Sequence, residues 1–97
     1  MKYNWKPGEN QYQRYYDVYV GKVYLLVFEN KFQPGIWLGM YNEHMVENKT
    51  ENDKIRSELG ERVYNFQRHT MLSSDNPKYM MEKVEYAFEN KLTEVDE

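Results

Sequence analysis

The sequence predicts an α+β domain in which a three-stranded antiparallel meander is followed by two helices packed on one sheet face. Two patterns carry this prediction: apolar residues alternate with period two in the first half and recur at helical spacing in the second. The length of 97 residues suits a single domain. We divide it into a lead-in (1–11), the β-meander (12–41), a loop (42–52), two helices (53–92) and an acidic tail (93–97).

The lead-in is rich in turn-forming residues, with Pro7, Gly8 and Asn10 close together. It also holds one large apolar residue, Trp5. An isolated tryptophan usually packs against the nearest apolar surface. We expect Trp5 to cap an open end of the core.

A hairpin is predicted where the alternating segment that starts at Gln13 reaches Gly21-Lys22 and continues as the apolar run Val23 to Phe28. A two-residue link that begins with Gly favours a type II′ turn, because Gly tolerates the positive φ at its first position. This turn fixes the register and sends the Val and Leu side chains to one face. The expected pairs are Val20 with Val23, Val18 with Leu25, Tyr16 with Val27, Tyr19 with Tyr24, Asp17 with Leu26 and Tyr15 with Phe28.

The third strand is predicted over Ile36 to Tyr41, after a loop that contains Pro34-Gly35. We expect the larger aromatic residues to share the side away from the Val and Leu side chains. The resulting aromatic face is predicted to hold Tyr15, Tyr19, Tyr24, Phe28, Trp37 and Tyr41.

The first helix is expected to start near Thr50, which with Asp53 resembles a capping box. Its apolar stripe recurs at spacings of four, four and three residues. That stripe consists of Ile55, Leu59, Val63 and Phe66.

The second helix is expected to start at Asn76, a favoured N-cap residue, with Pro77 in the first helical position. Its apolar stripe is Met80, Met81, Val84, Ala87, Phe88 and Leu92. Three carboxylates lie on one side of this helix and form an acidic strip: Glu82, Glu85 and Glu89.

Composition narrows the class of protein. The chain has no cysteine, which excludes disulfides and cysteine-ligated zinc and favours a reducing compartment. It has no apolar run near the roughly 18 residues of a spanning helix, so we expect no membrane association and a cytoplasmic location. The net charge is −3, without the basic stripe that duplex DNA requires.

No motif specifies a reaction, so we expect a protein that is not an enzyme and has no cofactor and no metal. The two histidines, His44 and His69, lack metal-ligand spacing. Asp17 with Glu29-Asn30-Lys31 loosely resembles the acidic and Glu-x-Lys elements of metal-dependent nucleases. The Glu-x-Lys pattern also occurs at Glu47–Lys49 and Glu89–Lys91, as chance allows in a chain rich in Lys and Glu.

The strongest functional indication is the aromatic face, because two helices can cover only one side of a sheet. Ten of the residues are tyrosines, which suit half-buried surfaces and interfaces. The leading hypothesis is a binding protein that uses this face, with the acidic strip, to dock on and occlude a protein partner or to dimerise. The alternatives are a face that is solvated or covered by the N-terminal segment, and a surface that stacks single-stranded nucleic acid.

In size, in richness of Tyr, Asn and Lys, and in its lack of Cys, the chain broadly resembles small accessory proteins of bacteriophages and mobile elements. The resemblance covers no motif. It implies a viral protein that inhibits a host defence or nucleic-acid enzyme in the host cytoplasm.

Overall fold

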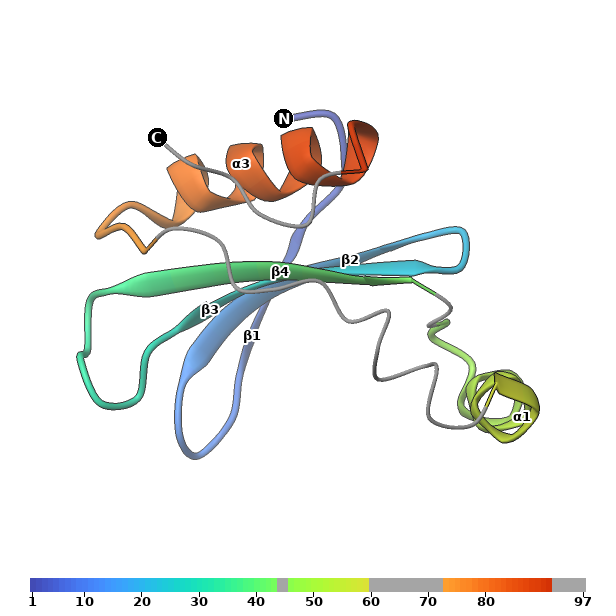
Figure 1. Ribbon diagram of the computed structural model, residues 1–97. Coiled ribbons are helices and arrows are strands. Elements are labelled where there is room, and N and C mark those ends of the chain that lie inside the picture. The colour runs from blue at the N-terminus through green and yellow to red at the C-terminus, as the bar shows by residue number, and fades with distance from the viewer. Residues whose placement is uncertain (44–45, 60–72, 92–97) are drawn as a thin grey trace.

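The computed structural model describes residues 1–43, 46–59 and 73–91 (Figure 1). Within these ranges, one antiparallel sheet holds four strands in the order β1-β2-β3-β4, and two helices accompany it. The α+β class is as predicted, but the three-stranded meander is wrong because the lead-in contributes a strand. The elements are β1 (Lys6–Glu9), β2 (Arg14–Val20), β3 (Val23–Glu29), β4 (Trp37–Glu43), α1 (Lys49–Leu59) and α3 (Pro77–Glu89).

Strand β1 lies at the sheet edge and pairs with β2, with Lys6 opposite Asp17 and Gly8 opposite Tyr15. Pro and Gly disfavour a central strand, but an edge strand tolerates both because its outer side needs no ladder hydrogen bonds. Gly8 also has a packing role, since a Cβ at this position would overlap the Tyr15 ring. The turn-forming residues of the lead-in therefore did not indicate the strand that forms there.

The β2–β3 hairpin has the predicted register in all six pairs, from Tyr15 opposite Phe28 to Val20 opposite Val23. Gly21 has a φ of 63°, as its place in the turn demands. A side chain there would be strained by roughly 1–2 kcal/mol. The local turn chemistry thus determines which side chains share a face.

Strand β4 starts and ends later than predicted, and its register reverses the expected placement of two aromatic residues. The preceding loop closes with a 2.7 Å hydrogen bond from the Asn30 amide to the Ile36 carbonyl. This closure puts Trp37 opposite Glu29 and Tyr41 opposite Leu25. Both aromatic residues therefore lie on the core face, which is the sheet face toward α3, and their predicted place on the aromatic face is wrong.

Helix α3 packs on the core face (Figure 1). Asn76 is its N-cap as predicted, because its Oδ1 accepts hydrogen bonds from the Lys78 and Tyr79 amides at 3.0 and 3.3 Å. Backbone groups of Trp37 and Ser74 exchange two hydrogen bonds and fix the entry to the helix. The buried core consists of Leu25, Val27, Trp37, Tyr41, Met80, Met81, Val84 and Ala87.

The N-terminal segment runs alongside α3 and packs against this core. Trp5 and Tyr3 are partly buried there, so the prediction that Trp5 caps the core is confirmed. The first residues reach the helix through Glu85, which accepts hydrogen bonds from them.

Helix α1 lies beyond one end of the sheet, away from α3 (Figure 1). Among the described helices, α3 alone covers the core face, so the prediction that two helices pack on one sheet face is wrong for α1. The α1 N-cap is Asn48, whose Oδ1 accepts a 2.9 Å hydrogen bond from the Glu51 amide, and not Thr50. Several predicted features lie outside the described residues: His44, Val63, Phe66, His69, Leu92 and the acidic tail.

Candidate functional site

The sheet side opposite α3, here called the reverse face, gathers four of the aromatic residues predicted from the sequence. The β2–β3 register places Tyr15 opposite Phe28 and Tyr19 opposite Tyr24 on this side. Strand β4 adds Leu38 and Met40 to it, opposite Phe28 and Leu26. The reverse face is therefore apolar and aromatic over three strands, without Trp37 and Tyr41.

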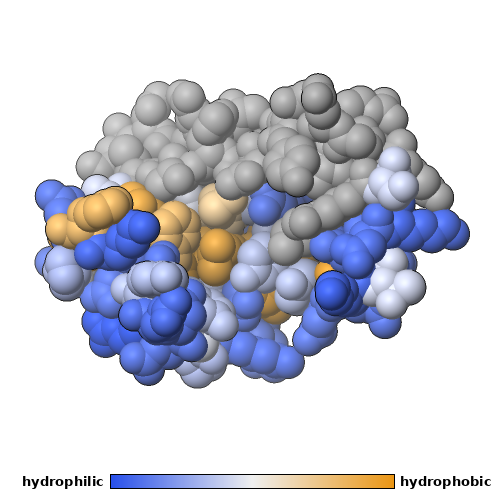
Figure 2. Space-filling model, turned by 90° about the horizontal axis from the view of Figure 1, so that it is seen from below, coloured by the Kyte–Doolittle hydropathy of each residue, from blue (hydrophilic) through white to orange (hydrophobic). Residues whose placement is uncertain are grey.

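An open groove of about 390 Å³ lies on the reverse face. Its walls combine aromatic and aliphatic side chains with one carboxylate and two side-chain amides. Figure 2, which views the molecule from the side opposite α3, shows hydrophobic surface next to hydrophilic side chains. The groove is lined by Asn10, Gln13, Tyr15, Asp17, Tyr24, Leu26, Phe28 and Met40.

Asp17 and Tyr24 hold each other in position in this groove. The Tyr24 hydroxyl donates a 2.8 Å hydrogen bond to Oδ2 of Asp17. Burial, reinforced by this bond, raises the pKa of Tyr24 far above its ordinary value, so the hydroxyl stays protonated. The Tyr19 and Tyr24 rings pack with centroids 4.6 Å apart. The groove is thus built from side chains that already have partners.

Two aromatic side chains project from the loops beside the groove, and sequence reasoning missed both. Tyr12 is 67 % exposed and Phe32 is 82 % exposed. The Lys31 ammonium lies 5.8 Å from the Tyr12 ring centroid and 5.0 Å from that of Phe32, so it links the two loops. We call Tyr12, Lys31 and Phe32 the loop cluster.

Each loop of this cluster is shaped by an asparagine. Asn10 Oδ1 accepts a 2.8 Å hydrogen bond from the Tyr12 amide, and Asn30 Oδ1 accepts a 2.9 Å bond from the Phe32 amide. Such Asx turns fix the backbone two residues after the asparagine. The repeated pattern Asn-x-aromatic, in Asn10 to Tyr12 and Asn30 to Phe32, was the sequence signal that could have revealed the cluster.

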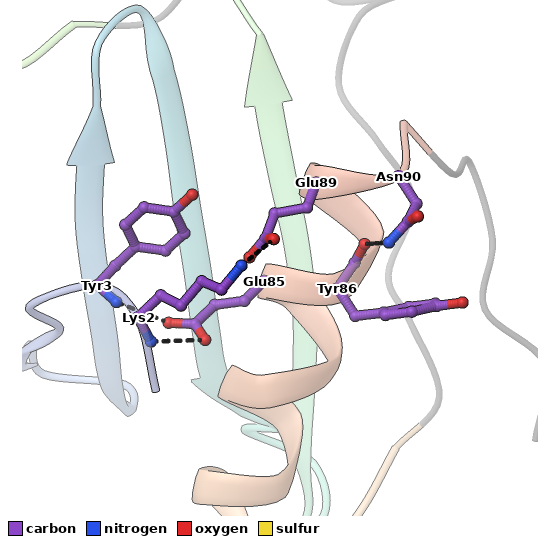
Figure 3. A network of polar contacts seen from close by, with 6 residues as sticks. All are labelled: Lys2, Tyr3, Glu85, Tyr86, Glu89 and Asn90. Carbon is purple, nitrogen blue, oxygen red and sulfur yellow. Dashed lines mark hydrogen bonds and ion pairs between the residues drawn. The ribbon is translucent and has the colours of Figure 1, made fainter.

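The predicted acidic strip is largely occupied by the N-terminal segment (Figure 3). Glu85 is buried, and its carboxylate accepts hydrogen bonds from the Lys2 amide, the Tyr3 amide and the Trp5 indole at 3.2, 3.1 and 2.8 Å. Glu89 forms a 2.6 Å ion pair with Lys2, and this contact raises the pKa of Lys2. Of the three carboxylates, Glu82 alone points to solvent without such a contact in the described structure.

The nuclease-like pair does not form a site. Asp17 lies on the reverse face, whereas Glu29 lies on the core side, where Arg14 donates to both of its oxygens at 3.0 and 2.8 Å. These bonds, with one from the Gly35 amide, lower the pKa of Glu29 to about 2. Within residues 1–43, 46–59 and 73–91, no three His, Asp or Glu side chains are placed to hold a metal ion.

Comparison with known proteins finds no matching family model, no similar curated protein and no similar solved structure. None of the helices in the described ranges is long and apolar enough to cross a membrane. The candidate site therefore depends on geometry alone.

Proposed function

We propose that this chain is a non-enzymatic protein-binding domain that docks on a partner through the reverse face and the loop cluster. The observation that carries the proposal is the groove, with Tyr12 and Phe32 exposed beside it. Contiguous apolar surface on a small domain usually marks an interaction site. Tyrosine is also enriched among the residues that dominate binding energy.

The groove and the loop cluster favour binding because few of their groups must become ordered when a partner binds. The Asx turns hold the backbone of the loop cluster, and the bond from Tyr24 to Asp17 holds the groove wall. Ordering a flexible side chain at an interface costs about 0.5–1.5 kcal/mol. A surface that is already fixed avoids part of this cost.

The charge of the groove argues for a protein partner over single-stranded nucleic acid. Among the lining residues that the structure describes, Asp17 is the charged one. Its carboxylate would repel a phosphate backbone that crossed the aromatic rings. We expect no binding of a fluorescent oligothymidylate at low salt, and salt-sensitive binding would favour the nucleic-acid alternative.

A quantitative affinity capture from extracts of the source cells tests the proposal. The double variant Tyr12→Ser/Phe32→Ser removes both loop aromatics, and Tyr86→Ser removes an aromatic of similar exposure on α3 as the matched control. Because all three side chains are exposed, folding should be preserved. We expect the double variant to lose partners that wild type and Tyr86→Ser retain; equal recovery by all three would contradict the proposal.

More specifically, we propose that docking blocks the functional surface of a host protein, in the manner of a phage or mobile-element inhibitor. It is supported by the resemblance in size and composition, together with an aromatic surface that lacks a reaction motif. Self-association is the competing form. Light scattering of the purified protein separates them: a monomer supports a heterologous partner, and a dimer disrupted by Tyr12→Ser/Phe32→Ser supports self-association.

A further inference from the structure

The groove on the reverse face is negatively charged at one point and otherwise uncharged, which restricts the class of ligand that it can bind. Among the described lining residues, Asp17 supplies the negative charge, and the other side chains are aromatic, aliphatic or amide. The hydrogen bond from Tyr24 uses Oδ2 of Asp17. In the described part of the chain, Oδ1 accepts no hydrogen bond, so it can receive a second donor.

Aromatic rings surround this carboxylate. Tyr15 and Phe28 are cross-strand partners beside Asp17 and its partner Leu26, and Tyr24 touches Asp17 directly. The faces of aromatic rings attract cations such as a guanidinium, by about 0.5–2 kcal/mol. A carboxylate among rings therefore suits a basic side chain in both charge and shape.

A cation held between an aromatic ring and a carboxylate occurs on the core side of this protein. The Arg14 guanidinium lies 5.4 Å from the Trp37 ring centroid and donates to both Glu29 oxygens. There the protein supplies the cation, the ring and the carboxylate. Among the described residues that line the groove, it supplies the rings and the carboxylate without a cation.

Lys6 lies directly opposite Asp17 in the pairing of β1 with β2. It forms no ion pair with Asp17 in the described structure, although Lys6 and Asp17 both line a second hollow next to the groove. Its positive charge should nevertheless weaken the binding of a second cation. Lys6 therefore provides a variant that is expected to improve binding.

We infer that the groove binds an arginine or lysine side chain of a protein partner, with the cation on Asp17 and neighbouring apolar residues of the partner against Leu26 and Phe28. This inference rests on the proposed function and specifies the chemistry of the partner. The occupant is a segment in which a basic residue is flanked by apolar ones.

NMR titration of the full chain with four capped tripeptides, Ac-Leu-Xaa-Leu-NH2 with Xaa as arginine, lysine, citrulline or glutamate, tests the inference. Citrulline has the shape of arginine without its charge. We expect the arginine and lysine peptides to bind about five- to tenfold more tightly than the citrulline peptide. The glutamate peptide should bind most weakly, and the shifted amides should lie in β2 and β3.

Three variants assign the preference to Asp17. Asp17→Asn should abolish it, while its side-chain oxygen still accepts from Tyr24 and preserves the fold. Glu82→Gln removes the same charge from an exposed site and should leave the preference unchanged. Lys6→Gln should strengthen binding of the arginine peptide by about two- to threefold.

Equal binding of the arginine and citrulline peptides, retention of the preference in Asp17→Asn, shifts that map away from the groove, or absence of binding would each overturn the inference. The proposed function can survive these outcomes, since the Tyr12→Ser/Phe32→Ser capture tests it without reference to charge. If neither the difference in capture nor the preference for basic peptides is observed, both the proposed function and this inference are overturned.

Discussion

The ring of Tyr15 lies across Gly8, its partner on the neighbouring strand, so closely that a Cβ at position 8 would overlap it. An alanine in a strand normally stabilises a protein by about 0.5–1 kcal/mol relative to glycine. Here it must displace the ring that forms one wall of the groove. The glycine is therefore linked to the shape of the candidate site.

We expect Gly8→Ala to lower the free energy of unfolding by about 1 kcal/mol, because the Tyr15 ring loses its packing. In a Tyr15→Ala background the same substitution should be neutral or stabilising. Urea denaturation of the four proteins in this double-mutant cycle measures the reversal of sign. Equal effects of Gly8→Ala in both backgrounds would show that the ring does not rest on Gly8.

Glu85 is expected to be the most sensitive carboxylate of α3. In Glu85→Gln, the amide nitrogen must face at least one of the three N–H donors from Lys2, Tyr3 and Trp5. An unsatisfied buried donor costs about 1–3 kcal/mol, so we expect a loss of that size in urea unfolding. Glu82→Gln, one helical turn away and exposed, should change stability by less than about 0.5 kcal/mol; equal losses would contradict the account.

The ion pair of Glu29 is expected to make the stability of the fold sensitive to acid. Its pKa is lowered from 4.5 to about 2 in the folded protein, chiefly by the bond from Arg14. A lowered folded-state pKa gives stability that is present above the unfolded-state pKa and is lost as the pH falls. We expect the stability difference between wild type and Glu29→Gln to shrink between pH 4.5 and about 2. A difference that stays constant over this range in urea titrations would contradict the ion pair.

The stabilising effect of Tyr24 is expected to be lost at high pH, in contrast to that of Glu29. Burial and the bond to Asp17 raise its folded-state pKa above the ordinary 10.0, so its stabilising effect is present below that pH and is lost as the pH rises beyond it. Tyr24→Phe should cost about 0.5–1.5 kcal/mol at pH 7 through the lost hydrogen bond. The stability gap between the two proteins should narrow above pH 10; a gap that widens there would show that the hydroxyl is not held by Asp17.

Local chemistry made the β2–β3 hairpin and the start of α3 predictable. Gly21-Lys22 specifies a turn whose register is confirmed in every pair, and Asn76-Pro77 marks the helix start. Four reverse-face aromatics followed from that register. These features depend on residues close in sequence, where turn and capping preferences act directly.

The missed features depend on contacts between distant segments. Strand β1 forms because β2 pairs with it, against the local preference of Pro7-Gly8. The side on which Trp37 lies is set by how the loop closes between Asn30 and Ile36, which alternation alone does not reveal. Glu85 accepts a hydrogen bond from Trp5, 80 positions earlier in the chain. A helical surface pattern cannot indicate such a partner.

The central claim is that the reverse face is the surface that meets a protein partner. Photo-crosslinking in the source cells tests it most directly, with benzoylphenylalanine placed at Phe28 in the groove and, as control, at the exposed Tyr86 on α3. We predict a discrete crosslinked species from position 28 that is absent from position 86. No crosslink at position 28, or the same species from both positions, would contradict the claim.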